Sequence, residues 1–319
     1  MLIFWFVLKK YIVWEVKLNF KNARNKTIKK RRGESRMSTE IFYFSGTGNS
    51  LYVAKELQKL IPDTQLIPMV KQLPKEVVKT EAEVVGFVFP VHALTLPIPV
   101  RKFLKKIDLR SRQFVFAVAT RLGLVFNDFK KVDQLLKKQR KRLDSHFLIN
   151  MYSNDVKFEN YQTPTPQEIQ KIESKVNEHL DAIAKVILNR ERSLEKDTDY
   201  LIGLPYNRFF NFFLERLVVF AHGFSEYIGG VNYFYTDSRC NGCGICSRVC
   251  LSQKIRMIDK TPVWDKKVLC YMCYACVNFC PKQAAQIKGI PGVVKSYSQN
   301  NGRYPHPYAT VKDLEDQKV

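Results

Sequence analysis

All eight cysteines of the chain lie in two short stretches that share one spacing. Each stretch reads C-x2-C-x2-C-x3-C, and thiolates are the ligands that iron–sulfur clusters prefer. Three cysteines two residues apart can bend a short loop around three corners of an iron–sulfur cube, whereas the fourth starts a helix that points away. The spacing therefore predicts metal ligation by Cys240, Cys243, Cys246, Cys250, Cys270, Cys273, Cys276 and Cys280.

Two other uses of cysteine fit this pattern less well. Zinc sites favour two C-x2-C pairs or mixed Cys/His sets, and no histidine lies between Cys240 and Cys280. A disulfide framework is typical of small secreted chains, whereas these cysteines are confined to one segment of a long chain. The spacing favours iron–sulfur ligation over both.

A second candidate site follows an apolar run near the start of the regular part of the chain. The run Glu40–Phe44 has the residue types of a strand, and Leu51–Leu60 has helical spacing. A helix N-terminus offers unpaired N–H groups, glycines admit close approach, and hydroxyls add donors. The segment lacks the lysine of a P-loop and the third glycine of a dinucleotide fingerprint. It predicts a phosphate-binding loop made of Ser45, Gly46, Thr47, Gly48, Asn49 and Ser50.

Strand and helix patterns alternate from Met37 onward, which predicts an α/β fold with a parallel sheet covered on both faces. Further strands are expected at Leu66–Val70, Glu83–Phe89, Gln113–Thr120 and Phe147–Tyr152, and helices at Pro99–Ile107 and Asp128–Arg142. Thr165-Pro166-Gln167-Glu168 is a capping box that marks the start of another helix. Ligands of such sheets bind beyond the carboxyl ends of the strands.

Two resemblances assign these elements to a family. The loop Ser45–Ser50 resembles the FMN phosphate loop of flavodoxins, and the cysteine stretches resemble those of bacterial-type two-cluster ferredoxins. Together, Met37–Lys288 resembles the EFR-type ferredoxin family of anaerobes, which fuses these two domains. The resemblance implies FMN and two [4Fe-4S] clusters as cofactors. It also implies a flavodoxin-like doubly wound five-stranded sheet followed by an α+β ferredoxin-like domain.

The same resemblance implies which residues bind each cofactor. It assigns Cys240, Cys243, Cys246 and Cys280 to one cluster, and Cys250, Cys270, Cys273 and Cys276 to the other. Pro281 follows Cys280 as the family pattern expects, but Leu251 follows Cys250, a departure that removes no ligand. The flavin-ring loops would be Pro90, Val91, His92, Ala93 and Leu94, and Thr120, Arg121 and Gly123. His92 either contacts the ring or is a loop histidine without a ligand, and Arg121 either stabilises reduced flavin or is simply exposed.

The 319 residues are enough for two domains and their connections. We expect the FMN domain at 37–192 and the two-cluster domain at 231–290, with a hairpin at Arg256–Ile258 and Val263–Trp264. Within the linker 193–230, the aromatic segment Tyr206–Phe220 predicts a helix packed between the domains. Residues 291–319 read as a polar surface tail. For residues 1–36 we hypothesise a misassigned start, because Arg31–Glu34 in purine-rich codons would encode a ribosome-binding sequence before Met37.

The chain is strongly basic, with 52 Lys and Arg against 30 Asp and Glu and a formal net charge of +22. Residues 1–36 hold eleven Lys and Arg against two Glu, and bound clusters and flavin phosphate would lower the remainder. The residual excess either steers acidic electron-transfer partners or solvates helix faces. No recognition helix or RNA-binding signature is present, so no nucleic-acid partner is expected. No apolar run approaches the roughly twenty residues of a membrane span.

The implied function is electron transfer in an oxygen-poor cytoplasm. FMN exchanges electrons in pairs or singly, and each cluster exchanges one electron at a time. The protein would therefore convert between two-electron and one-electron transfers for redox partner proteins. One alternative is an FMN-dependent oxidoreductase that reduces an unknown substrate with electrons from the ferredoxin domain. Another is an iron–sulfur nucleic-acid binder or sensor, which would show salt-sensitive DNA binding.

Overall fold

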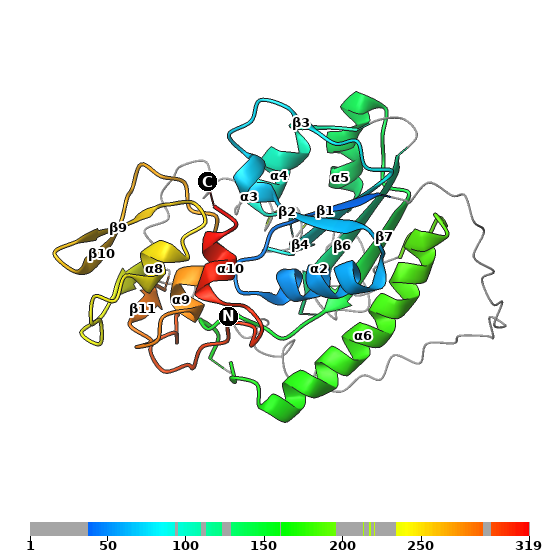
Figure 1. The fold of residues 1–319 in the computed structure, drawn as a ribbon. Helices are drawn as coiled ribbons and strands as arrows, with labels where there is room; N and C mark the ends of the chain where they lie inside the picture. Colours follow the sequence, from blue (N-terminus) through cyan, green and yellow to red (C-terminus); the bar gives the residue numbers. More distant parts are fainter. Residues whose placement is uncertain are drawn as a thin grey trace.

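The structure is a computed structural model that describes residues 38–92, 95–109, 113–122, 129–159, 161–195, 213, 217, 220, 234–289 and 295–318. Its centre is a five-stranded parallel sheet in the order β2-β1-β4-β6-β7 (Figure 1). The strands are β1 (Thr39–Tyr43), β2 (Thr64–Pro68), β4 (Val84–Pro90), β6 (Phe114–Arg121) and β7 (Ser145–Asn150). With the short pair β3 (Val78–Lys79) and β5 (Ile107–Asp108) left aside, this is the doubly wound order of flavodoxin-like sheets. The predicted α/β class is confirmed.

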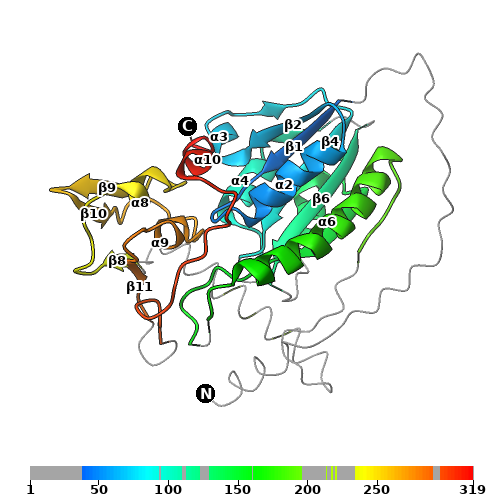
Figure 2. The ribbon, with the colours of Figure 1, turned by 60° about the horizontal axis from the view of Figure 1, so that its bottom comes forward.

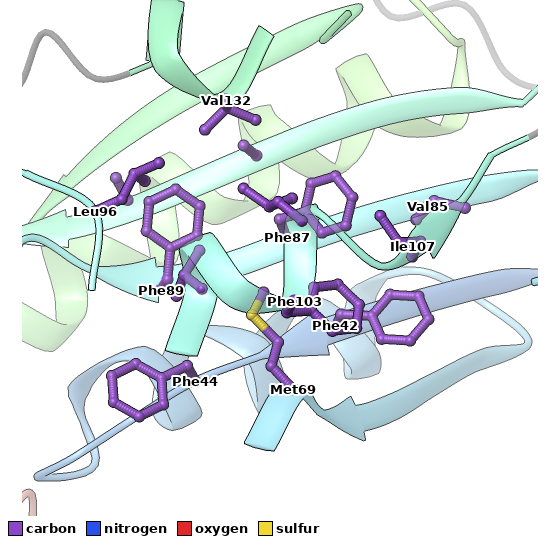
Figure 3. Close-up of a cluster of buried hydrophobic side chains, with 14 of the residues drawn as sticks. Phe42, Phe44, Met69, Val85, Phe87, Phe89, Leu96, Phe103, Ile107 and Val132 are labelled. Carbon is purple, nitrogen blue, oxygen red and sulfur yellow. The ribbon is translucent and has the colours of Figure 1, made fainter. Parts of the chain in front are cut away.

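Helices cover both faces of this sheet. On one face α3 (Met69–Gln72), α4 (Ile98–Leu104) and α5 (Phe129–Leu136) enclose an aromatic core that includes Phe42, Phe87 and Phe103 (Figure 3). On the other face α2 (Asn49–Leu60) and α6 (Pro166–Leu188) pack on a second core. Alternate residues of β1 enter the two cores, since Phe42 belongs to the first and Ile41 to the second. The sheet is therefore buried on both sides and fixes the positions of its loops.

Most element boundaries agree with the sequence patterns, and the exceptions have local causes. The capping box of α6 is present, with the Thr165 N–H donating to Glu168 Oε2 at 2.8 Å and the Glu168 N–H donating to Thr165 Oγ1 at 3.3 Å. The strand expected to run to Val70 ends at Pro68, where α3 begins. The helix expected to run to Arg142 ends at Leu136 and continues as the 3-10 turn η1 (Lys137–Gln139), because Arg140 takes a left-handed conformation.

The cysteine stretches belong to a smaller unit beside the sheet. There β8 (Phe234–Thr236) pairs with β11 (Ala285–Ile287), and β9 (Ile255–Ile258) with β10 (Thr261–Trp264), both antiparallel. The predicted hairpin is thus β9–β10. Two one-turn helices, α8 (Ile245–Arg248) and α9 (Ala275–Asn278), contain the third cysteine of each stretch, Cys246 and Cys276. This unit has a small core of its own, and its residues Val249, Leu251 and Ala275 join the main core of the sheet.

Residues 295–318 do not form the expected surface tail. This segment, which we call the C-terminal strap, crosses between the sheet and the cysteine unit and includes α10 (Val311–Glu315), drawn in red in Figures 1 and 2. Tyr304, His306, Leu314 and Gln317 are buried. Its polar composition misled the sequence argument because the polar groups bond to backbone of both units rather than to water.

Two other expectations fall largely outside the described residues. Residues 1–36 lie wholly outside them. Of the predicted linker helix, Phe213, Leu217 and Phe220 are described, and all three are helical with exposed side chains. Among the described helices, none combines the length and apolarity needed to cross a membrane.

Candidate cofactor sites

The eight cysteines line two cavities, four to each. The inner cavity, of about 300 Å³ including space open to solvent, is lined by Cys250, Cys270, Cys273 and Cys276. The outer cavity, of about 340 Å³ on the same measure, is lined by Cys240, Cys243, Cys246 and Cys280. Each cavity takes three cysteines from one stretch and the last cysteine of the other. All eight are free thiols.

The one-turn helices explain why the last cysteine of each stretch crosses to the other cavity. Cys250 lies two residues beyond the end of α8 and is buried, and Cys280 lies two residues beyond α9. Backbone N–H groups then fix the crossing sulfurs, because Lys254 donates to Cys250 Sγ at 3.3 Å and Ala284 donates to Cys280 Sγ at 3.2 Å. Such N–H···S bonds stabilise thiolates in metal sites.

The inner cavity contains a buried cation. Lys254 lines it, is 2% exposed, and donates from Nζ to the backbone oxygens of Asp265 and Val268, the latter at 2.6 Å. Within the described ranges no carboxylate forms an ion pair with it. The ammonium also interacts electrostatically with the Asp265 carboxylate, and its positive charge beside the inner cavity favours an anionic occupant.

Burial raises the pKa of four of the cysteine thiols. It raises the pKa of Cys246 and Cys270 to about 11, and it raises the pKa of Cys273 and Cys276 further above the usual range. Without a metal these thiols are neutral, and a metal must displace their protons. Among the described residues, no group of three or more His, Cys, Asp or Glu side chains is placed to hold a metal ion.

The loop Ser45–Ser50 joins β1 to α2 at the carboxyl edge of the sheet, and all six of its residues are buried. The Ser45 hydroxyl accepts from the Gly48 N–H at 3.1 Å, and the Ser50 and Thr120 hydroxyls lie 2.8 Å apart. In the described part of the chain, the N–H groups of Gly46, Thr47 and Asn49 donate to no acceptor. Buried N–H groups without acceptors at a helix N-terminus suit an anion such as phosphate.

The C-terminal strap covers one side of this loop. Gln317 bonds both backbone groups of Ser45, accepting from its N–H and donating to its carbonyl at 3.0 Å each. The His306 N–H donates to the Thr47 carbonyl at 2.7 Å. Lys55 and Asp313 form an ion pair at 2.8 Å that holds α10 to α2. The strap therefore helps to set the conformation of the loop.

The loops proposed for a flavin ring are described only in part. In the first, Val91 donates to the Thr120 carbonyl at 2.8 Å and His92 forms a tight turn with Thr95, whereas Ala93 and Leu94 lie outside the described residues. In the second, the Thr120 hydroxyl contacts Ser50, and Arg121 Nε donates to Asn150 Oδ1 at 3.1 Å. Gly123 also lies outside the described residues. Pro90 ends β4 beside Thr120, so the two loops meet at one edge.

The phosphate-type loop touches the inner cavity directly. A methyl group built on Gly46 would lie 2.4 Å from the Cys273 carbonyl oxygen and 2.6 Å from the Cys273 Cβ. Tyr271, which lines the inner cavity, lies edge-on to Phe44 with ring centroids 6.5 Å apart, and Phe44 lies 5.9 Å from the His92 ring. Residues at the sheet edge are thus in van der Waals contact with residues that line the inner cavity.

Sequence reasoning missed several of these residues. Lys254, His306 and Gln317 lie outside every motif recognised in the sequence, and Tyr271 lies between two cysteines of the second stretch without being singled out. A lysine four residues after the last cysteine of a stretch was the one visible signal for Lys254. The contacts of His306 and Gln317 bridge distant parts of the chain, so no local pattern could reveal them.

Comparisons with known proteins add little to this geometry. No protein-family model matches the chain, and a search of curated proteins found no match. Three solved structures are similar to part of this chain. A flavodoxin from Streptococcus pneumoniae TIGR4 has 17% identity over 46% of this chain and 98% of its own, with a TM-score of 0.28. An FMN-dependent NADH-azoreductase from Bacillus anthracis has 11% identity over 46% and 99% (TM-score 0.30), and an NAD(P)H:quinone oxidoreductase from Methanothermobacter marburgensis has 8% identity over 48% and 96% (TM-score 0.31). At these identities and scores the matches carry no information about the cofactor or substrate of this chain.

Proposed function

We propose that the chain is an electron-transfer protein that holds FMN at the sheet edge and one [4Fe-4S] cluster in each cysteine cavity. The observation that carries the proposal is the contact between Gly46 and Cys273, which joins the phosphate-type loop to the inner cavity. Two cofactor sites in such close contact suit transfer of electrons between them. We place the protein in an oxygen-poor cytoplasm, where reduced cysteines persist.

The cysteine cavities support the cluster assignment. In a cubane cluster each thiolate ligates a different iron, so four ligands surround a space rather than a point. The inner and outer cavities each have four cysteines around such a space. A cubane with four thiolates is anionic, and Lys254 provides a buried positive charge beside the inner one. Its ammonium would offset the negative charge there.

The loop Ser45–Ser50 supports the flavin assignment. The unpaired N–H groups of Gly46, Thr47 and Asn49 would hold the phosphate, and the hydroxyls of Thr47 and Ser50 would add donors. The loops of His92 and Arg121 would border the ring, since the first follows β4, which lies next to β1, and the second follows β6, which lies next to β4. FMN supplies exchange of electrons in pairs or singly, and each cluster exchanges one at a time.

Protein purified without oxygen tests the proposal by its content of iron, sulfide and released flavin. We expect about eight iron, eight sulfide and one FMN per chain. Iron without flavin would contradict the role of Ser45–Ser50, and flavin without iron would contradict the role of the cysteines.

Two matched variants test the crossed ligand sets. Cys250→Ser should impair the cluster of Cys270, Cys273 and Cys276, and Cys280→Ser the cluster of Cys240, Cys243 and Cys246. In electron paramagnetic resonance of the reduced proteins, Cys250→Ser should then lose the same signal as Cys273→Ser, and Cys280→Ser the same signal as Cys243→Ser. If each substitution instead affects the cluster of its own stretch, the crossed assignment is wrong.

A further inference from the structure

The two cysteine cavities differ in their access to solvent. The inner cavity lies against the sheet, with Cys250 and Cys276 buried and Cys273 packed on Gly46. At the outer cavity Cys243 is exposed, and a methyl group built on Gly244 would meet no atom within 4 Å. An electron that enters or leaves the protein therefore has its shortest path through the outer cavity.

Exposed residues border the outer cavity on several sides. Asn241, Pro281 and Lys282 line it and are exposed, and Lys260 lies beside Gly242, 2.8 Å from a built methyl group. One side of the hairpin β9–β10 completes the lining through Met257 and Pro262. Figures 1 and 2 both show this hairpin at the end of the molecule away from the sheet. We call this surface of Asn241, Cys243, Lys260, Pro281 and Lys282 the outer face.

The charge of the cysteine unit is positive and partly unpaired. Residues 234–289 hold nine Lys and Arg against three Asp. Asp237 pairs with Arg239 and Asp265 with Arg256, which leaves Asp259 as the remaining carboxylate, exposed beside Lys260. In the described part of the chain Lys260 and Lys282 form no ion pair, and neither do Lys266 and Lys267. Even with two anionic clusters bound, this unit would attract a negatively charged surface.

We propose that the outer face is the docking surface for an acidic one-electron carrier protein. This inference rests on the proposed function, because it requires a cluster in the outer cavity. Lys260 and Lys282 would steer the carrier toward Cys243, and the uncovered backbone at Gly244 would let the carrier approach the cluster closely. Complementary charge of this kind raises the rate of association more than it raises affinity.

The test uses the full chain with its cofactors bound. An acidic bacterial ferredoxin, reduced beforehand, serves as the electron donor in stopped-flow mixing. The variant Lys260→Glu/Lys282→Glu reverses two charges on the outer face. The control Lys138→Glu/Lys185→Glu reverses two exposed charges on η1 and α6 and so changes the net charge equally.

At low ionic strength we expect the outer-face variant to lower the bimolecular rate constant by about tenfold or more, and the control by about twofold at most. Added salt should slow the wild type and speed or leave unchanged the outer-face variant. Equal rate constants for the two variants, with iron and sulfide contents equal to wild type, would overturn the docking surface alone. A wild-type protein that holds no iron would overturn the proposed function and this inference with it.

Discussion

The inner and outer cavities have the same ligand types and spacing but opposite surroundings. The inner cavity has a buried lysine, two buried cysteines and the sheet edge against it. The outer cavity has an exposed cysteine and open space at Gly244. A repeated motif therefore produces two sites that differ because of what the rest of the chain packs on them. Under the proposed function, the inner site would exchange electrons inside the molecule and the outer site would exchange them with a partner.

Of the changes considered, removal of iron should have the largest effect on the cysteine unit relative to the sheet. The cysteine unit has a small core in which Cys250 and Cys276 are themselves members, so under the proposed function it would depend on bound iron for stability. We expect anaerobic chelation to remove hydrogen-exchange protection across residues 234–289 while the strands of the sheet stay protected. Protection of residues 234–289 that survives complete iron loss would contradict this dependence.

Substitutions of two glycines should show how tightly the chain is packed beside each cavity. Gly46→Ala puts a methyl group against the Cys273 backbone, which cannot move cheaply, and should lower the free energy of unfolding by about 2–3 kcal/mol. Gly244→Ala meets no neighbour but requires a left-handed residue at φ 74°, and should cost about 1 kcal/mol. Denaturant unfolding of both variants measures the difference. A larger loss for Gly244→Ala would mean that the outer loop is the tighter of the two.

Lys254→Met should change the two cluster potentials unequally. Loss of a buried positive charge disfavours the more negative reduced form, so the potential of the inner cluster should fall by on the order of 100 mV. The outer cluster in the same molecules is the internal control and should shift much less. A spectroscopic redox titration resolves the two, and equal shifts would show that Lys254 does not act locally.

The strap should give the smallest effect. Glu315 accepts from Arg248 Nε at 2.8 Å and Nη2 at 3.0 Å, and these hydrogen bonds lower the pKa of its carboxyl below the usual 4.5. A lowered pKa contributes stability that is complete above that value and is lost as the pH falls through the lowered pKa. Between pH 7 and pH 5 we therefore expect no change in proteolysis of the wild-type strap. Glu315→Gln should be cut slightly faster at both pH values, and a rate that rises only at pH 5 would contradict this.

Local patterns predicted the sheet well because its signals are short in range. The apolar run of β4 and the capping box at Thr165 specify a strand and a helix start within a few residues. The resemblance to two-cluster ferredoxins implied two crossed sets of four cysteines, and the same sets line the two cavities, whereas ligation by them stays a prediction.

The rest depended on contacts between distant segments. The position of Lys254 four residues after Cys250 was too weak a signal, because the burial of its side chain makes its charge significant and the sequence does not show that burial. Residues 291–319 were predicted to be a surface tail, because a polar sequence does not reveal whether its side chains form hydrogen bonds with water or with protein backbone. Gln317 shows the difference, since both of its amide atoms bond the backbone of Ser45.

The strap contact has a consequence for the order of assembly. Ser45 and Gln317 are 272 residues apart, and both cysteine stretches lie between them in the chain. Because a ribosome delivers a chain from its N-terminus, the sheet and its phosphate-type loop can fold well before their cover is synthesised. During that interval the loop is open on the side that Gln317 later occupies. Closure by the strap would thus be a late event in biosynthesis, and under the proposed function the earlier interval would give a bulky phosphorylated cofactor time to enter.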